Sequence, residues 1–111
     1  MYPVTVSTTD ASSAAKTSSM VALDTFATQF QVSVGCAVTG TVNYTVQYTL
    51  DNVLVEGFLP ASANWYNLTA LASKTGSLTS LIDFPVTALQ LVQNTGNGSV
   101  IMTVLQTGAG D

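Results

Sequence analysis

Hydrophobic and polar side chains alternate without interruption along residues 39–50. One side of this segment is apolar and consists of Val42, Tyr44, Val46, Tyr48 and Leu50. The other side is polar but uncharged and consists of Thr41, Asn43, Thr45, Gln47 and Thr49. A period of two predicts a β-strand with one buried face and one solvated face.

The same period occurs in the segments 2–9, 31–38, 84–93 and 99–106. The turn residues at 39–40 predict a hairpin that joins 31–38 to the strand at 42–50, and those at 94–98 predict a second hairpin that joins 84–93 to 99–106. Gly35 lies within the predicted strand 31–38 and suggests a bulge or a close neighbour there. The segments 84–93 and 99–106 are apolar on both faces, which indicates central strands or strands whose outer face meets a partner. We expect the N-terminal strand to return and pair with a late one.

No segment predicts a long helix. Residues 10–19 are small and polar and predict a loop, and residues 68–71 allow a single helical turn before the break at Gly76. Phe26 and Phe30 are expected to pack inward from an irregular link. Six to eight short strands with turns between them predict an all-β chain, a jelly-roll-like antiparallel β-sandwich in a single domain. Within it, residues 1–19 form an N-terminal strand and polar loop, a candidate arm, and residues 20–111 form the sandwich.

The composition narrows the function classes. Charged residues make up 7% of the 111 residues, against about 25% in an ordinary soluble domain. Two Lys stand against six acidic residues, without Arg or His, so the cations needed to bind nucleic acid or an anionic membrane surface are missing. The chain holds 17 Thr and 11 Ser, and such a surface has little charge to keep it away from other proteins.

The residues offer no catalytic or metal-binding constellation. Cys36, the single cysteine, is in phase with the apolar side of its strand, and without any histidine it lacks a general base. Asp51 and Glu56 could be imagined as the carboxylate pair of a glycosidase, but solvated loop acids are the better interpretation. We therefore expect no enzyme activity, no catalytic residue, no cofactor and no metal.

Two features suggest a partner instead. The uncharged row Thr41, Asn43, Thr45, Gln47 and Thr49 is a candidate contact surface, although Thr is also common on solvated sheet faces. Trp65 and Tyr66 could stack on a sugar or lie in a protein interface, and the alternative is that one ring plugs the end of the sandwich. Tyr2 joins these candidates at the N-terminus.

Several segments together resemble a known family. They are V-T-G-T-V-N-Y-T-V-Q-Y-T-L-D-N-V at 38–53, A-N-W-Y-N at 63–67, F-P-V-T-A-L-Q-L at 84–91 and G-S-V-I-M-T-V-L-Q at 98–106. From about residue 20 onward the chain resembles the capsid decoration proteins, also called staple or cement proteins, of epsilon15-like podoviruses. These motifs are strand patterns rather than catalytic signatures.

The resemblance implies a non-enzymatic protein of the virion. Such a protein would lie on the exterior of an icosahedral phage capsid, bind the major capsid protein, and staple neighbouring subunits near two-fold positions as a homodimer. Residues 1–19 are matched least, and an arm function for them is a conjecture. The start of the chain has neither a basic nor an apolar leader region, so we expect the protein to be made in the host cytoplasm. The alternative function is a carbohydrate-binding jelly-roll module displayed on the virion.

Overall fold

The computed structural model describes residues 3–23 and 31–107. Nine strands form in this part of the chain: β1 (Val4–Thr9), β2 (Lys16–Thr17), β3 (Val21–Ala22), β4 (Gln31–Thr39), β5 (Asn43–Thr49), β6 (Trp65–Asn67), β7 (Leu78–Ile82), β8 (Ala88–Thr95) and β9 (Ser99–Thr107). Two single turns of 3-10 helix, η1 (Pro60–Ser62) and η2 (Thr69–Leu71), lie on either side of β6. The prediction of an all-β chain with one helical turn near 68–71 is confirmed.

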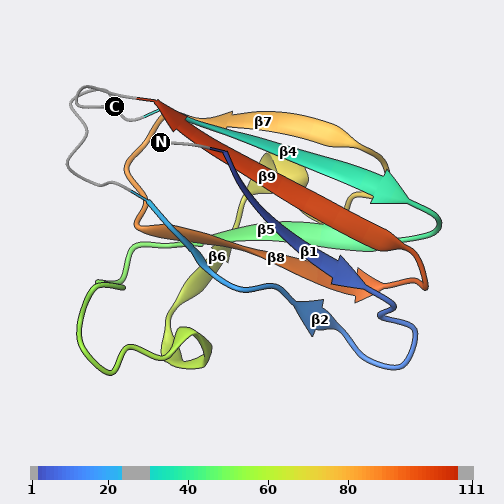
Figure 1. Ribbon diagram of the computed structural model, residues 1–111, viewed down its shortest axis with the longest axis horizontal. Coiled ribbons are helices and arrows are strands. Elements are labelled where there is room, and N and C mark those ends of the chain that lie inside the picture. The colour runs from blue at the N-terminus through green and yellow to red at the C-terminus, as the bar shows by residue number, and fades with distance from the viewer. Residues whose placement is uncertain (1–2, 24–30, 108–111) are drawn as a thin grey trace.

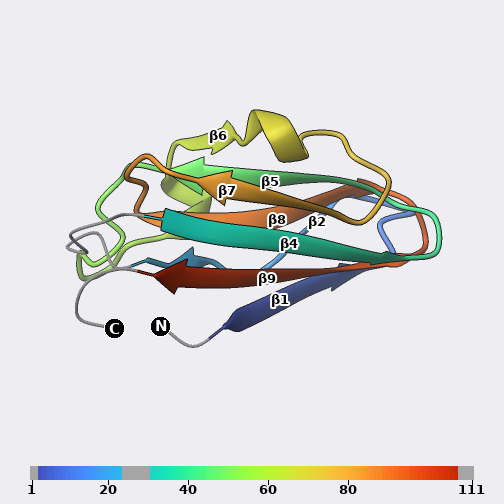
Figure 2. The same cartoon turned by 90° about the horizontal axis from the view of Figure 1, so that it is seen from above.

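The strands form two antiparallel sheets that pack face to face (Figures 1 and 2). Sheet A has the order β1-β9-β4-β7, and sheet B has the order β2-β8-β5-β6 with the short β3 also paired to β8. β2 and β3 can be counted as one interrupted strand, which leaves eight strands. Numbered 1 to 8 in chain order, these strands have the orders 1-8-3-6 in sheet A and 2-7-4-5 in sheet B, which is the strand order of a jelly roll. The predicted β-sandwich is confirmed.

The four central strands form one long antiparallel pair, β4–β5 against β8–β9, and this pair bends at its middle so that one half lies in each sheet. β4 pairs with β9, and beyond the fold their continuations β5 and β8 pair with each other. On the outer side of β9 and β8, the chain from β1 to β3 follows the same course. The connections between β4 and β5 and between β8 and β9 therefore lie together at one end of the sandwich (Figures 1 and 2). We call residues 40–42 and 96–98 the crease.

Both predicted hairpins are wrong for this reason. β4 and β5 follow each other closely in the chain but belong to different sheets, and so do β8 and β9. Each turn carries the chain from one sheet to the other instead of returning it along the same sheet. The turn residues were recognised correctly, but a turn of this composition does not specify whether the next strand pairs with the last one.

The alternation itself is largely confirmed. Apolar residues of four central strands fill the space between the sheets, among them Val32, Val34, Cys36, Tyr44, Val46, Leu89, Leu91, Val100, Met102 and Val104. The exception is Leu50, predicted to be buried, which lies beyond the end of β5 with 57% of its surface exposed. Phe26 and Phe30 lie outside the described residues.

The N-terminal strand returns to the end of the chain as predicted. β1 pairs with β9 along its full length, from Val4 opposite Val104 to Thr9 opposite Ser99. The expected loop at 10–19 is interrupted only by the two residues of β2. The described part of the N-terminal segment is thus built into both sheets of the sandwich (Figure 2).

Candidate functional site

The candidate contact row on β5 lies on the outer side of sheet B, but it is only partly accessible. Thr41 is exposed, whereas Thr45 and Thr49 keep 6% and 0% of their surface exposed. The expectation of a solvated face is therefore wrong at these two threonines. Two segments account for this. The Ser73 backbone N–H, after β6, donates to Thr45 Oγ1 at 3.0 Å, and Trp65 of β6 stands opposite Thr49 in the strand register.

The amides of this row are bonded to amides of the neighbouring strands, in two separate groups. Gln90 Nε2 on β8 donates to Gln47 Oε1 at 2.8 Å, and Gln47 Nε2 donates to Asn67 Oδ1 on β6 at 3.0 Å. Asn94 Nδ2 donates to Asn43 Oδ1 at 2.9 Å and to Thr45 Oγ1 at 3.1 Å. These bonds fix the orientation of the amides, so any ligand on this face meets a rigid polar surface.

Trp65 and Tyr66 do not form a shared aromatic platform. Consecutive residues of a strand point to opposite sides, and here Trp65 is opposite Thr49 while Tyr66 is opposite Tyr48. The Tyr66 ring lies 5.7 Å from the ring of Tyr48, centroid to centroid, and remains half exposed. Tyr2, the remaining candidate, lies outside the described residues.

A groove runs beside Trp65 on the outer side of sheet B. It has a volume of about 430 Å³. Pro60 and Ala61 of η1 line it together with Trp65, and the chain around Thr17 and Ser19 lines it from another side. The Gln90 side chain, of which 7% is exposed, completes the polar part of the lining. Three segments far apart in sequence thus meet at this groove, so Trp65 is its only residue that sequence reasoning could select.

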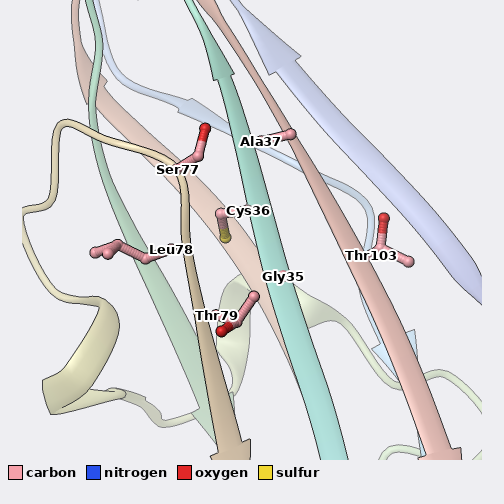
Figure 3. A pocket seen from close by; sticks show the side chains of 7 residues that line it. All are labelled: Gly35, Cys36, Ala37, Ser77, Leu78, Thr79 and Thr103. Atoms are coloured by element: carbon pink, nitrogen blue, oxygen red, sulfur yellow. The ribbon is translucent and has the colours of Figure 1, made fainter.

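A second hollow, of about 520 Å³, lies at Gly35 on the outer side of sheet A (Figure 3). Gly35 stands between Thr79 on β7 and Thr103 on β9 in an unbroken register, so the predicted bulge is wrong. A Cβ atom at this position would lie 3.7 Å from Thr79 Cγ2, an ordinary contact. The hollow is the place that a larger side chain of β4 would fill.

The outer side of sheet A is uncharged around this hollow and combines apolar side chains with Thr and Ser. Register places Leu81, Ser33 and Leu105 in one row across β7, β4 and β9. The next row crosses β7, β4, β9 and β1 and contains Thr79, Gly35, Thr103 and Thr5. The row after it crosses β4, β9 and β1 and contains Ala37, Ile101 and Ser7. Leu81 and Ile101 expose 56% and 47% of their surface. We call this surface the A face.

Cys36 points to the other side of β4, into the core. Burial raises the pKa of its thiol to about 11, although a hydrogen bond with Tyr44 opposes the shift. The Tyr44 hydroxyl donates to the Gly76 carbonyl oxygen at 2.7 Å, and burial, with Cys36 as a smaller cause, raises its pKa to about 12. Cys36 therefore stays a protonated thiol near neutral pH, as expected of a buried apolar side chain.

The acidic pair of the hydrolase interpretation is not assembled into a site. Asp51 Oδ2 accepts a hydrogen bond from the Asn64 backbone N–H at 2.9 Å, and Glu56 is exposed in the loop before η1. Within residues 3–23 and 31–107, His, Cys, Asp and Glu form no group of three that could hold a metal ion. The same residues contain no helix with the length and hydropathy to cross a membrane.

Comparison of the chain with protein-family models, with curated proteins and with solved structures finds no match in any of the three.

The A face was not among the residues singled out from the sequence. For Ile101 and Leu105 a signal existed, because the segment 99–106 is apolar on both sides. Leu81 carries no such signal, because the segment Leu78–Ile82 shows no clear period of two. Its polar neighbours on β7 obscure the period of two, and only pairing with β4 reveals it.

Proposed function

We propose that this protein is a non-enzymatic structural protein of a phage virion that binds the outer capsid surface and staples neighbouring major capsid proteins. The observation that carries the proposal is the A face, an exposed sheet surface with leucine and isoleucine side chains and without charge. A surface with so little charge has little to keep other proteins away, and its exposed leucine and isoleucine side chains favour contact with a protein. The resemblance to capsid decoration proteins supplies the class of partner.

Among the described residues, no charged side chain belongs to a strand of sheet A. In the described residues, Lys16 is in β2, Lys74 is in the connection after η2, and the carboxylates Asp10, Asp51, Glu56 and Asp83 are in connections between strands. A partner that covers the A face therefore does not have to desolvate a charged group, which is the costly step in burying a surface. The threonines and serines can form hydrogen bonds directly or through trapped water.

The size of the A face argues for two copies. With strands about 4.8 Å apart, two of them about 30 Å long and the other two about 20 and 17 Å long, the flat area is roughly 450 Å². That is below the roughly 800 Å² per partner of a standard stable interface. Two copies side by side would exceed it, and binding through both would raise the overall affinity without any new kind of contact.

The free edge of β1 suits such a pairing. Asp10 N–H bonds to the Gly98 carbonyl, and the alternation of an antiparallel ladder then directs the backbone groups of Thr5, Ser7 and Thr9 away from β9. Residues 4–9 carry no charge that would protect this edge. Two β1 strands could pair antiparallel about a two-fold axis perpendicular to the sheet, which leaves both A faces on the same side. Paired β1 strands in an image of decorated particles would support this arrangement, and contact through another element would contradict it.

The proposal is tested by heating virions with and without the protein while DNA release is followed. We expect decorated particles to release their DNA at higher temperature, and equal release temperatures would contradict the stapling function. Leu81→Asp should reduce capsid occupancy at least tenfold, because a charge on the A face would have to be buried.

The matched control for this variant is Leu54→Asp. Leu54 lies in the loop after β5 and is even more exposed than Leu81, so both substitutions should leave the fold intact. Equal occupancy of the two variants would show that the A face does not contact the capsid.

A further inference from the structure

The groove beside Trp65 combines an aromatic ring, an amide and hydroxyl groups, and it lies on sheet B, the sheet that does not carry the A face. Its volume of about 430 Å³ falls within the range of about 300–1,000 Å³ found for small-molecule sites. A ligand here would leave the A face free. The groove is therefore a separate candidate site.

The Trp65 indole is held in a fixed orientation. Its Nε1–H donates to the Pro60 carbonyl oxygen at 2.8 Å, so the polar atom of the ring is already bonded within the protein. What the indole offers to the groove is apolar ring surface. Such a surface is suited to stacking on the C–H face of a sugar ring.

Gln90 supplies an oriented acceptor in the same groove. Its Nε2 is committed to Gln47, whose own amide is held by Asn67. Among the described residues, no donor is bonded to Gln90 Oε1. Every fully buried side-chain oxygen of these residues has a partner, so Oε1 is not fully buried. Because Gln90 lines the groove, we take Oε1 as the acceptor that faces it. A sugar hydroxyl can donate to this oxygen, and the Thr17 and Ser19 hydroxyls can act as donors or acceptors beside it.

The residues that line the groove include no charged side chain. An anionic sugar or a phosphate would lose its hydration without gaining a counter-charge. We propose that the groove is a binding site for a neutral saccharide, with the Trp65 ring as its apolar wall and Gln90, Thr17 and Ser19 as its hydrogen-bonding groups. Tyr66 takes no part in this site because it points to the opposite side of sheet B.

Trp65 is the only tryptophan of the chain, so its fluorescence reports on this groove alone. The full chain is titrated with a panel of neutral di- and trisaccharides built from glucose, galactose, mannose, rhamnose and N-acetylglucosamine. We expect a saturable change in emission with at least one of them. The sialylated and phosphorylated counterparts of that sugar should bind at least about tenfold more weakly, as expected when a charge is desolvated without a partner.

Two alanine-to-leucine variants separate the groove from the rest of the surface. Ala61 in η1 lines the groove and Ala70 in η2 does not, and both are exposed, so neither change should disturb the fold. Ala61→Leu should weaken saccharide binding at least about tenfold by filling the groove, and Ala70→Leu should leave it unchanged. The proposal is overturned if no sugar of the panel produces a saturable change, or if the change persists in Ala61→Leu. Either result would leave the capsid-stapling function standing, because that depends on the opposite sheet.

Discussion

At Gly96 the crease leaves no room for a side chain. Its φ of +101° lies in the region that favours glycine, and a Cβ atom would overlap the Thr41 carbonyl oxygen and lie 2.7 Å from Val42 Cα. The obstructing atoms are backbone and cannot move aside independently. The close packing of the two connections of the crease therefore requires a glycine at 96, and Gly98 is enclosed by backbone atoms in the same way.

Gly96→Ala should reduce the free energy of unfolding by about 2–4 kcal/mol, the combined effect of a strained backbone and an overfilled contact. Denaturant titration measures this loss. Gly76→Ala is the control, since a Cβ atom at Gly76 would meet nothing within 4 Å. Similar stabilities of the two variants would mean that the crease is not closed as described.

At the scale of single strands, β5 shows what its alternation could and could not reveal. The period of two correctly separated its two faces, because that separation depends on backbone geometry alone. It could not reveal that the chain at 69–74 would cover Thr45, because this segment is far away in the sequence. A polar row without charge is compatible with a solvated surface and with an internally bonded one.

Thr45→Val tests the internal bonding of this row. The variant keeps the side-chain shape but leaves the Ser73 N–H without its acceptor and removes one of the two hydrogen bonds of Asn94 Nδ2, which should cost about 1–3 kcal/mol of stability. Thr41→Val in the same row serves as the comparison and should change stability by less than about 0.5 kcal/mol, since Thr41 is exposed. An equally small loss in Thr45→Val would contradict the bonding network. Urea titration measures the free energy of unfolding of both variants, provided that its dependence on urea concentration has the same slope as in the unmodified protein.

At the scale of the molecule, the class of fold was predictable and the strand pairing was not. Short alternating segments without helices leave few ways to bury a core, and a sandwich is the simplest of them. The pairing of β4 with β9 and of β5 with β8 depends on long-range contacts, which the two turns at the crease do not encode.

The candidate sites, like the fold, were predictable only in part from the sequence. Trp65 was selected from the sequence because of its chemistry, whereas Gln90, Ala61 and Thr17 become its neighbours only through the fold. The A face likewise exists only after four strands are aligned. Jelly rolls occur both in viral capsid and in lectin domains, so the fold alone does not choose between capsid binding and sugar binding.

A cryo-EM reconstruction of phage particles decorated with the protein would show whether the A face contacts the capsid, as we propose. We predict that sheet A lies against the shell, with Leu81, Ile101 and Leu105 at the contact and sheet B turned outward. A reconstruction in which the A face is turned to solvent would contradict the claim.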